Sequence, residues 1–245
     1  MKIKELFEDG YIHYPVWLKE ILVNCLPYLT QIDFDLAKYP LYRGIRTNDN
    51  FKTILPCWEG YEFSYRLETT KENRKPVDTP QSLHCYVDDA FLKFFGKRYR
   101  SDHIVFGINN LVYISRYIGY PSILLPCGDF SFCWSPNVLD FSMECMEWFE
   151  DLDEEYPEYT YDKKVKIMSD LITRELKYQT TDLKAAIESK HEIMISCDKF
   201  YVIQASAIDI DVALRVLKRD LINLHRNPKH DVYNYNASNY NANHI

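Results

Sequence analysis

The stretch from residue 181 to residue 204 constrains the fold most, because its hydrophobic period changes from helical to extended within a few residues. It opens with a short amphipathic run, capped by Thr180 or Thr181, in which three apolar side chains share one helical face: Leu183, Ala186 and Ile187. Two apolar runs around a polar turn follow, over residues 191–196 and 200–204. This pattern predicts a helix and then an antiparallel hairpin.

Glu192 stands one step before the first apolar block of this predicted hairpin. A carboxylate at that position would be held rigidly at the edge of a sheet, where a cleft can use it for binding or catalysis. The other interpretation is a solvated residue at a strand end, which is where most glutamates lie. Whether Glu192 is a functional or a solvated residue depends on which other candidate site residues the rest of the chain contains.

Strands and helices are mixed along the rest of the chain. Apolar runs predict strands at residues 41–45, 61–67, 104–106, 122–125 and 130–134, with the last two paired across a turn at 127–129. Helical periodicity predicts helices at 15–29, from the Thr79-Pro80 cap pair to Gly96, from Asn109 or Asn110 to Ile118, and at 140–155, 163–177 and 206–224, the last capped by Ser206. We therefore predict an α+β fold.

Length and composition allow a substantial core. The 245 residues are 47% hydrophobic, enough for one large or two small domains, and we predict a single domain over 1–225 with a flexible Asn/Tyr-rich tail over 226–245. The scattered cysteines show no metal-binding spacing, which indicates reduced thiols and no metal site: Cys25, Cys57, Cys85, Cys127, Cys133, Cys145 and Cys197. A charged N-terminus and the lack of a long apolar run predict a cytoplasmic protein without a signal peptide or membrane span.

Charge is distributed unevenly along the chain. The net charge is −7, and residues 140–155 are strongly acidic with no basic side chain, which predicts a solvated helix with one apolar face. Basic side chains gather in two short groups: Lys71, Arg74 and Lys75, and Lys93, Lys97, Arg98 and Arg100. Such groups can bind phosphate, although most short basic runs are ordinary solvated surface.

The stretch around Glu192 resembles the last motif of the arginine–serine–glutamate class of ADP-ribosyltransferases. That motif is a Glu-x-Glu followed by a hydrophobic strand, a turn and a second strand. Here Glu192 takes the position of the second, catalytic glutamate, whereas Lys190 replaces the first. In the family the first glutamate helps to present an arginine acceptor, so Lys190 argues against modification of arginine.

The run Leu41-Tyr42-Arg43-Gly44 resembles the first-strand motif of the same family, in which the arginine grips the NAD phosphates. A planar guanidinium suits this task because it offers a fork of donors that lysine lacks. Gly44 would let a ligand approach the backbone. The alternative is an ordinary surface arginine on a strand.

Residues 100–119 resemble the central strand, turn and helix of the family. The family usually has a serine or threonine at the end of that strand, where this chain has Gly107 and Ile108. The serine role therefore passes to Ser101, which precedes the strand. The resemblance also implies that an aromatic side chain stacks on nicotinamide, and the candidates are Tyr42, Phe106 and Tyr117.

The resemblance implies an α+β fold in which a split β-sheet with flanking helices surrounds an NAD cleft, with Arg43 and Glu192 pointing into it. The implied reaction breaks the bond between nicotinamide and ribose in NAD, with Glu192 and Ser101 as catalytic residues, and transfers ADP-ribose to an acceptor that is a protein, a nucleic acid or water. Uncharacterised bacteriophage proteins of this fold are similar, which would place the protein in a host cytoplasm. A non-catalytic binding or inhibitor module and a structural protein of a virus particle are the alternatives.

Overall fold

Two antiparallel sheets organise the computed structural model, which describes residues 16–45, 52–58, 61–76, 79–145, 152, 156–205 and 210–227. The five-stranded sheet has the order β1 (Tyr42–Ile45), β5 (Tyr120–Cys127), β8 (Lys199–Ala205), β3 (Tyr61–Thr69) and β2 (Lys52–Trp58). The three-stranded sheet has the order β4 (Ile104–Gly107), β7 (Ile193–Ser196) and β6 (Ser131–Trp134). Sheets and helices together confirm the expected α+β class.

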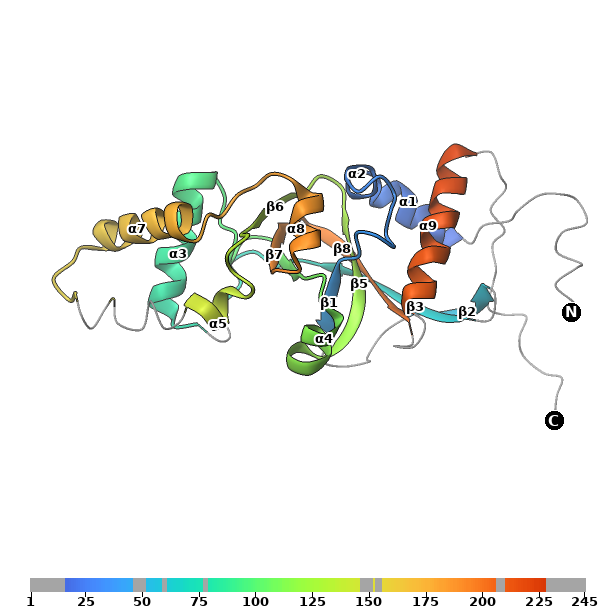
Figure 1. Cartoon of the computed structure of the whole chain (residues 1–245), viewed down its shortest axis with the longest axis horizontal. Helices are drawn as coiled ribbons and strands as arrows, with labels where there is room; N and C mark the ends of the chain where they lie inside the picture. Colours follow the sequence, from blue (N-terminus) through green and yellow to red (C-terminus); the bar gives the residue numbers. More distant parts are fainter. Residues whose placement is uncertain are drawn as a thin grey trace, which may run out of the picture.

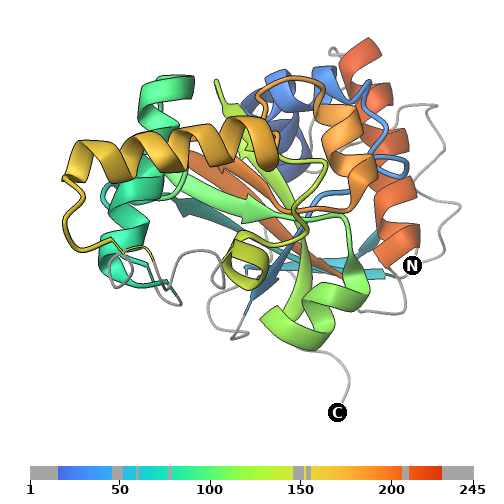
Figure 2. The same cartoon turned by 60° about the vertical axis from the view of Figure 1, so that its left-hand side comes forward.

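Helices lie at both ends of the sheets (Figure 1). One end has α1 (Val16–Asn24), α2 (Leu26–Gln31) and α9 (Ile210–Arg226), and the other has α3 (Gln81–Phe95) and α7 (Tyr161–Asp170). Figure 2 shows α7 (gold) crossing α3 (green), against which it packs. The end of α7 continues into a π-helical segment, η3 (Leu171–Glu175).

Two of the expected strand pairings are wrong. We expected β7 to form a hairpin with β8, and β5 with β6, but the members of each pair belong to different sheets. Because β7 lies between β4 and β6, and β8 lies between β5 and β3, neither strand has an edge left for the other. The connections at 128–130 and 197–198 thus carry the chain from one sheet to the other. Two apolar runs around a polar turn are compatible with either arrangement.

The three-stranded sheet separates two hydrophobic clusters, because successive side chains of a strand point to opposite faces. The side chains on one face join the larger cluster, which includes the five-stranded sheet, α1, α2 and α9; they are Val105, Phe132 and Ile195. The side chains on the other face join the smaller cluster, with α3 and α7; they are Phe106, Cys133 and Met194. Any residue on this second face lies among the helices at the α3 end.

The expected N-terminal helix over 15–29 is interrupted at Cys25, which separates α1 from α2. Pro27 explains the break, since it lacks the N–H that a continuous helix would need at that point. Asn110 caps α4 (Leu111–Tyr113) as expected, its side chain accepting the N–H of Tyr113, and the helix continues as η2 (Ile114–Ile118).

Other expected helix ends are shifted by one residue or more. α8 (Leu183–Ser189) is capped by the side chain of Asp182 and not by a threonine, and α3 follows Pro80 without a side-chain cap. Gly96 ends α3 in the left-handed conformation, as expected. Of the acidic helix expected over 140–155, the structure describes α5 (Phe141–Cys145) and Leu152, while Ser206 and residues 228–245 lie outside the described residues.

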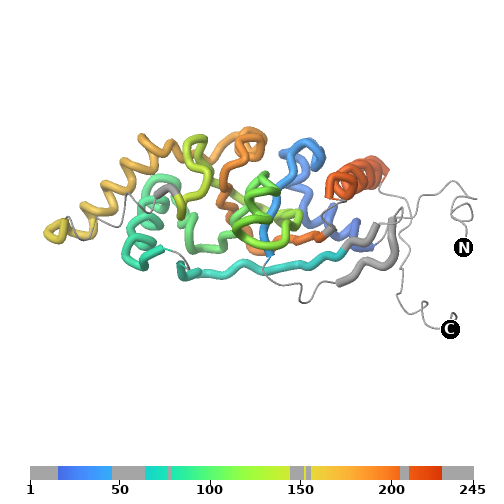
Figure 3. The backbone as a smooth tube through the Cα atoms, turned by 60° about the horizontal axis from the view of Figure 1, so that its bottom comes forward, coloured from blue at the N-terminus to red at the C-terminus, as the bar shows by residue number. Residues whose placement is uncertain are grey.

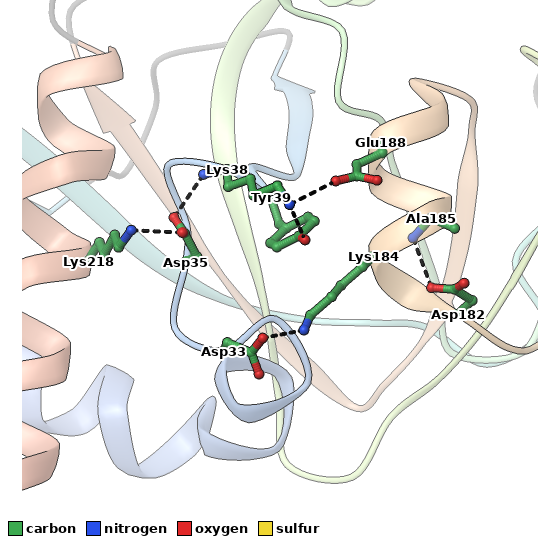
Figure 4. A network of polar contacts seen from close by, with 9 residues as sticks. All are labelled: Asp33, Asp35, Lys38, Tyr39, Asp182, Lys184, Ala185, Glu188 and Lys218. Atoms are coloured by element: carbon green, nitrogen blue, oxygen red, sulfur yellow. Dashed lines mark hydrogen bonds and ion pairs between the residues drawn. The ribbon is translucent and has the colours of Figure 1, made fainter.

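Ion pairs hold the loop between α2 and β1 against α8 and α9 (Figure 4). The pairs are Lys218–Asp35 at 2.8 Å, Lys184–Asp33, and Lys38–Glu188 at 3.3 Å. Two consecutive residues of this loop, Asp33 and Phe34, have positive φ angles of 53° and 59°, which is an unfavourable conformation for residues other than glycine. The ion pairs therefore fasten a strained loop to the two helices beside it.

The segment after β3 reaches the three-stranded sheet. In Figure 3 the chain from β3 (cyan) runs along the molecule toward α3 (green). The N–H of Thr70 donates to the carbonyl of Asp198 at 2.9 Å, and the N–H of Arg74 donates to the carbonyl of Ser101 at 2.9 Å. Arg74 is thereby fixed beside the loop that leads into β4.

Candidate functional site

Glu192 lies in the connection between α8 and β7, one residue before the strand begins at Ile193. The strand expected from residue 191 is therefore shorter than predicted. The N–H of Glu192 donates to the carbonyl of Leu139 at 2.8 Å, and the neighbouring His191 ring bonds the carbonyl of Ser135 at 2.9 Å. These bonds hold the connection against the segment that follows β6, and they leave the Glu192 side chain only 17% exposed.

Arg100 is the charged partner of Glu192. Its Nη1 atom lies 3.5 Å from Oε1 of Glu192, and its side chain is 7% exposed. Neither of these two buried atoms makes a hydrogen bond with a residue that the structure describes. Buried polar atoms are usually hydrogen-bonded, so two facing charged atoms joined only by an ion pair need an explanation, and a functional role is one.

Two aromatic rings and a second arginine complete the surroundings. The Arg100 guanidinium lies 4.3 Å from the centre of the Phe141 ring and 5.3 Å from that of Phe106, and the Arg74 guanidinium lies 4.7 Å from Phe106. Cation–π attraction holds both guanidinium groups at these rings. We call Arg74, Arg100, Phe106, Phe141 and Glu192 the Glu192 cluster; it lies on the α3 side of the three-stranded sheet.

Asp88 of α3 positions two residues of the loop that leads into β4. This buried carboxylate accepts the N–H of Arg100 at 3.0 Å and the hydroxyl of Ser101. The carbonyl of Ser101 in turn accepts the N–H of Arg74. Ser101, predicted as a catalytic serine, follows Arg100 in the chain, but its hydroxyl donates to Asp88 and its carbonyl positions Arg74.

His84, one turn before Asp88 on α3, is also buried beside the cluster. Its pKa is lowered by burial first and then by the positive charge of Arg100, so the imidazole is neutral at physiological pH. A hydrogen bond with the backbone of Arg74 acts in the opposite direction on this pKa. His84 therefore places a neutral imidazole beside Arg74 and Arg100.

Burial raises the pKa of Glu192 to about 7; Arg100 opposes the rise and Asp140 adds to it. Asp140 accepts the hydroxyl of Tyr113 at 2.7 Å. Burial, followed by that hydrogen bond, raises the pKa of Tyr113 well above its ordinary value, which keeps the phenol protonated. Glu192 thus exchanges its proton near neutrality, as general acids, bases and charge-stabilising carboxylates often do.

Arg43 belongs to the other sheet. It lies on β1 opposite Ser122 of β5, and its guanidinium is 5.5 Å from the centre of the Phe200 ring on β8. Burial lowers its pKa, and the charge of Glu68 on β3 opposes that change. The neighbours of Arg43 named above thus belong to the five-stranded sheet. The neighbours of Glu192 belong to helices and loops around the three-stranded sheet.

Two further residues predicted to bind NAD have structural roles in the core. Tyr42 is 2% exposed and exchanges backbone hydrogen bonds of 3.1 Å and 2.9 Å with Ile108, which links β1 to the end of β4. Gly44 is approached by the side chain of Ile118: a Cβ at this position would lie 2.4 Å from its Cγ2 atom. Close packing within the protein therefore accounts for this glycine, for which we expected ligand contact.

Tyr117, the remaining aromatic candidate, is on the surface of η2. It is 58% exposed, and its ring lies 5.1 Å from that of Tyr113. A shallow, open depression on the same helical segment is lined by Leu111, Val112, Ser115 and Arg116. None of these lining residues belongs to the Glu192 cluster.

Of the predicted site residues, the structure brings Ser101 and Phe106 next to Arg100, the charged partner of Glu192, while Arg43, Tyr42 and Gly44 line the contact between β1 and its neighbours. The functional candidates that sequence reasoning missed are Arg74, Arg100, Phe141, Asp88 and His84. A signal did exist for the arginines, since both fall in the two basic groups that we considered for phosphate. Nothing in the linear sequence indicates that these two groups meet at Glu192.

Lys190 is not on the strand with Glu192. It is the C-cap of α8, with a left-handed φ of 62°. A carboxylate placed there would therefore project from a helix end, so Lys190→Glu would not place a second glutamate on the strand that follows Glu192.

Within the described residues, no group of three or more His, Cys, Asp or Glu side chains is arranged to hold a metal ion, and none of the helices has the length and hydropathy to span a membrane. No protein-family profile, curated protein or solved structure matches this chain.

Proposed function

We propose that this protein is an ADP-ribosyltransferase-like enzyme that cleaves NAD between nicotinamide and ribose, with Glu192 as its catalytic carboxylate. One observation carries the proposal: Glu192 is buried against Arg100, and the facing atoms of both side chains lack a hydrogen-bond partner among the described residues. The motif resemblance around Glu192 supplies the reaction class.

The chemistry suits a fixed carboxylate. Departure of neutral nicotinamide leaves positive charge on the ribose, as in glycoside cleavage. An ionised Glu192 stabilises that charge because it is held in place, shielded from water and close to where the charge develops. Its pKa of about 7 leaves it substantially ionised at neutral pH.

In this proposal Arg100 and Arg74 bind the diphosphate, because both guanidinium groups lie at the Phe106 ring within the same cluster. Guanidinium groups bind phosphate oxygens in a bidentate manner, and a cluster with two of them compensates the charge of a diphosphate. Arg43 would have this role by resemblance, but its described neighbours lie in the other sheet. Phe106, which is partly buried, remains the aromatic candidate for contact with nicotinamide.

The acceptor is not an arginine side chain in this proposal, because Lys190 at the end of α8 replaces the glutamate that would present it. Another protein side chain, a nucleic acid or water can accept the ADP-ribose. Products formed from NAD alone report transfer to water, whereas labelling of added protein or nucleic acid reports the other two.

A non-catalytic nucleotide-binding module is the second candidate. It is favoured by Ser101, whose hydroxyl donates to Asp88, and by the separation of Arg43 from Glu192. Such a module would use the same cluster to bind an anionic nucleotide without breaking it.

Nicotinamide release from NAD by the purified protein, measured by chromatography, tests the enzymatic proposal. We expect release by the wild type, loss of release in Glu192→Gln with the fold unchanged, and wild-type release in Glu158→Gln, whose side chain is exposed in the turn before α7. Calorimetric binding of NAD without nicotinamide release would establish the second candidate instead. If the protein neither binds NAD nor releases nicotinamide, both the enzymatic proposal and the binding-module candidate are wrong.

A further inference from the structure

Cys25 and Cys127 lie side by side although they are 102 positions apart in the sequence: their Sγ atoms are 3.7 Å apart. Cys25 occupies the break between α1 and α2, and Cys127 is the last residue of β5. The two backbones are tied next to the cysteines, because the N–H of Gly128 donates to the carbonyl of Asn24 at 2.6 Å. The sulfur atoms can therefore meet through side-chain rotation, without separation of the helix from the strand.

The two thiols differ in reactivity. Cys25 is fully buried, and burial raises its pKa well above the ordinary value. Cys127 is half-buried, and its pKa is lowered chiefly by the hydrogen bond from Cys25; burial opposes this, while the N–H of Tyr201 and the charge of Lys199 assist it. An accessible thiol with a lowered pKa next to a shielded thiol is the usual arrangement of an attacked and a resolving cysteine.

We propose that Cys25 and Cys127 are a redox-modification site that forms a reversible disulfide when the protein meets hydrogen peroxide. The Cys127 thiolate attacks one peroxide oxygen, the O–O bond breaks, and Cys127 becomes a sulfenic acid as hydroxide leaves. Cys25 then loses its proton and attacks the Cys127 sulfur, the S–O bond breaks, and water leaves. Two thiols are oxidised and one peroxide is reduced to two waters.

Cys197 is the competing partner, and its position disfavours it. It is 3% exposed in the connection between β7 and β8, and burial followed by the nearby Cys127 raises its pKa to about 12. The Sγ atom of Cys25 lies 3.7 Å from that of Cys127, within hydrogen-bonding distance, so Cys25 is placed to attack the sulfur that the oxidant modifies.

The disulfide would join the α1–α2 layer covalently to β5. It would close a long loop and remove conformational freedom mainly from the unfolded chain, so the oxidised protein should melt at a higher temperature. For a chain of this size the increase in Tm should be on the order of 5–10 °C. This inference is independent of the proposed NAD chemistry.

Mass spectrometry of the peroxide-treated, alkylated full chain tests the proposal. We expect one cross-linked peptide pair, containing Cys25 and Cys127, which dithiothreitol separates. The Tm increase should accompany it, be abolished in Cys127→Ser and persist in Cys85→Ser, a control thiol on α3. Because Cys127 is half-buried, its serine variant should fold; the wild-type peptide map requires no variant at all.

Three outcomes would overturn the proposal. They are a cross-link between Cys127 and Cys197, irreversible oxidation of Cys127 without any intrachain cross-link, and a Tm increase that survives in Cys127→Ser.

Discussion

A carboxylate that stabilises a ribose cation acts only when it is ionised, so the pKa of Glu192 sets the pH range of the proposed reaction. Burial raises this pKa to about 7, and Arg100 opposes the rise. We therefore expect kcat/KM for nicotinamide release to increase with pH and to level off above neutrality. In Arg100→Gln the midpoint should move to higher pH, because the positive charge that favours ionisation is lost.

Rates measured from about pH 5 to about pH 9 check this, with Arg215→Gln, an exposed position on α9, as the control. A wild-type midpoint near 4.5, the ordinary value for glutamate, would contradict a buried catalytic carboxylate. So would a midpoint that is identical in the wild type and in Arg100→Gln.

Lysine substitutions distinguish the arginine that the geometry favours from the one that the resemblance favours. Arg100→Lys keeps the charge but loses the guanidinium fork, so NAD binding should weaken by about 1–3 kcal/mol. Arg43→Lys should bind NAD as the wild type does, because Arg43 packs against Phe200 in the other sheet. Titration calorimetry measures both affinities. If Arg43→Lys is the weakened variant and Arg100→Lys is not, the phosphate role returns to Arg43.

At the scale of elements, Gly107 at the end of β4 is required by close packing. A Cβ at this position would lie 2.8 Å from Cδ1 of Leu41 and 3.0 Å from Cδ2 of Leu124. Both leucines are fully buried, so little room exists for adjustment. Gly107→Ala should therefore lower the free energy of unfolding by about 1–3 kcal/mol through overpacking between the two sheets.

Urea unfolding of Gly107→Ala beside Ser115→Ala, a substitution at an exposed position, provides the measurement. Equal stability of the two variants would show that the sheets can separate slightly at β4, and the packing explanation for this glycine would fail.

Lys190 at the end of α8 provides a second prediction at this scale, on the cost of its backbone conformation. Its left-handed backbone, with φ of 62°, is unfavourable for lysine and free of strain for glycine. The side chain is exposed, so little contact is lost on its removal. Lys190→Gly should raise the free energy of unfolding by about 0.5–1 kcal/mol, measured by urea unfolding. A destabilised Lys190→Gly would indicate that the lysine side chain makes a contact that outweighs its backbone strain.

Sequence patterns predicted the elements better than their pairing. Helical periodicity and Gly96 correctly located α3, and the apolar runs located most strands. Pairing depends on which strand edges remain free after the whole chain has folded. The sequence around β7 and β8 therefore cannot predict that these strands join different sheets. The same limit applies to the site, because Arg100 meets Glu192 only through the packing of β4 against β7, which no local pattern indicates.

For the molecule as a whole, the burial of Glu192 makes stability depend on pH. The group is easier to protonate in the folded state, with a pKa of about 7 against an ordinary value of 4.5, so folding is most favoured when the carboxyl is neutral. This contribution is fully present below about pH 4.5, decreases as pH rises, and is lost above about pH 7. At about 1.4 kcal/mol for each tenfold change in proton affinity, the loss amounts to about 3 kcal/mol at most.

Glutamine reproduces the shape of the protonated carboxyl and does not ionise, so Glu192→Gln should match the wild type at low pH and exceed its stability at high pH. Urea unfolding of both proteins at about pH 5 and about pH 8 measures the difference, which should grow by up to about 3 kcal/mol between the two. Glu158→Gln, at an exposed position, should show no such growth. A difference between Glu192→Gln and the wild type that stays constant with pH would mean that Glu192 titrates like a solvated glutamate, and the buried ion pair with Arg100 could then not be the basis of the site.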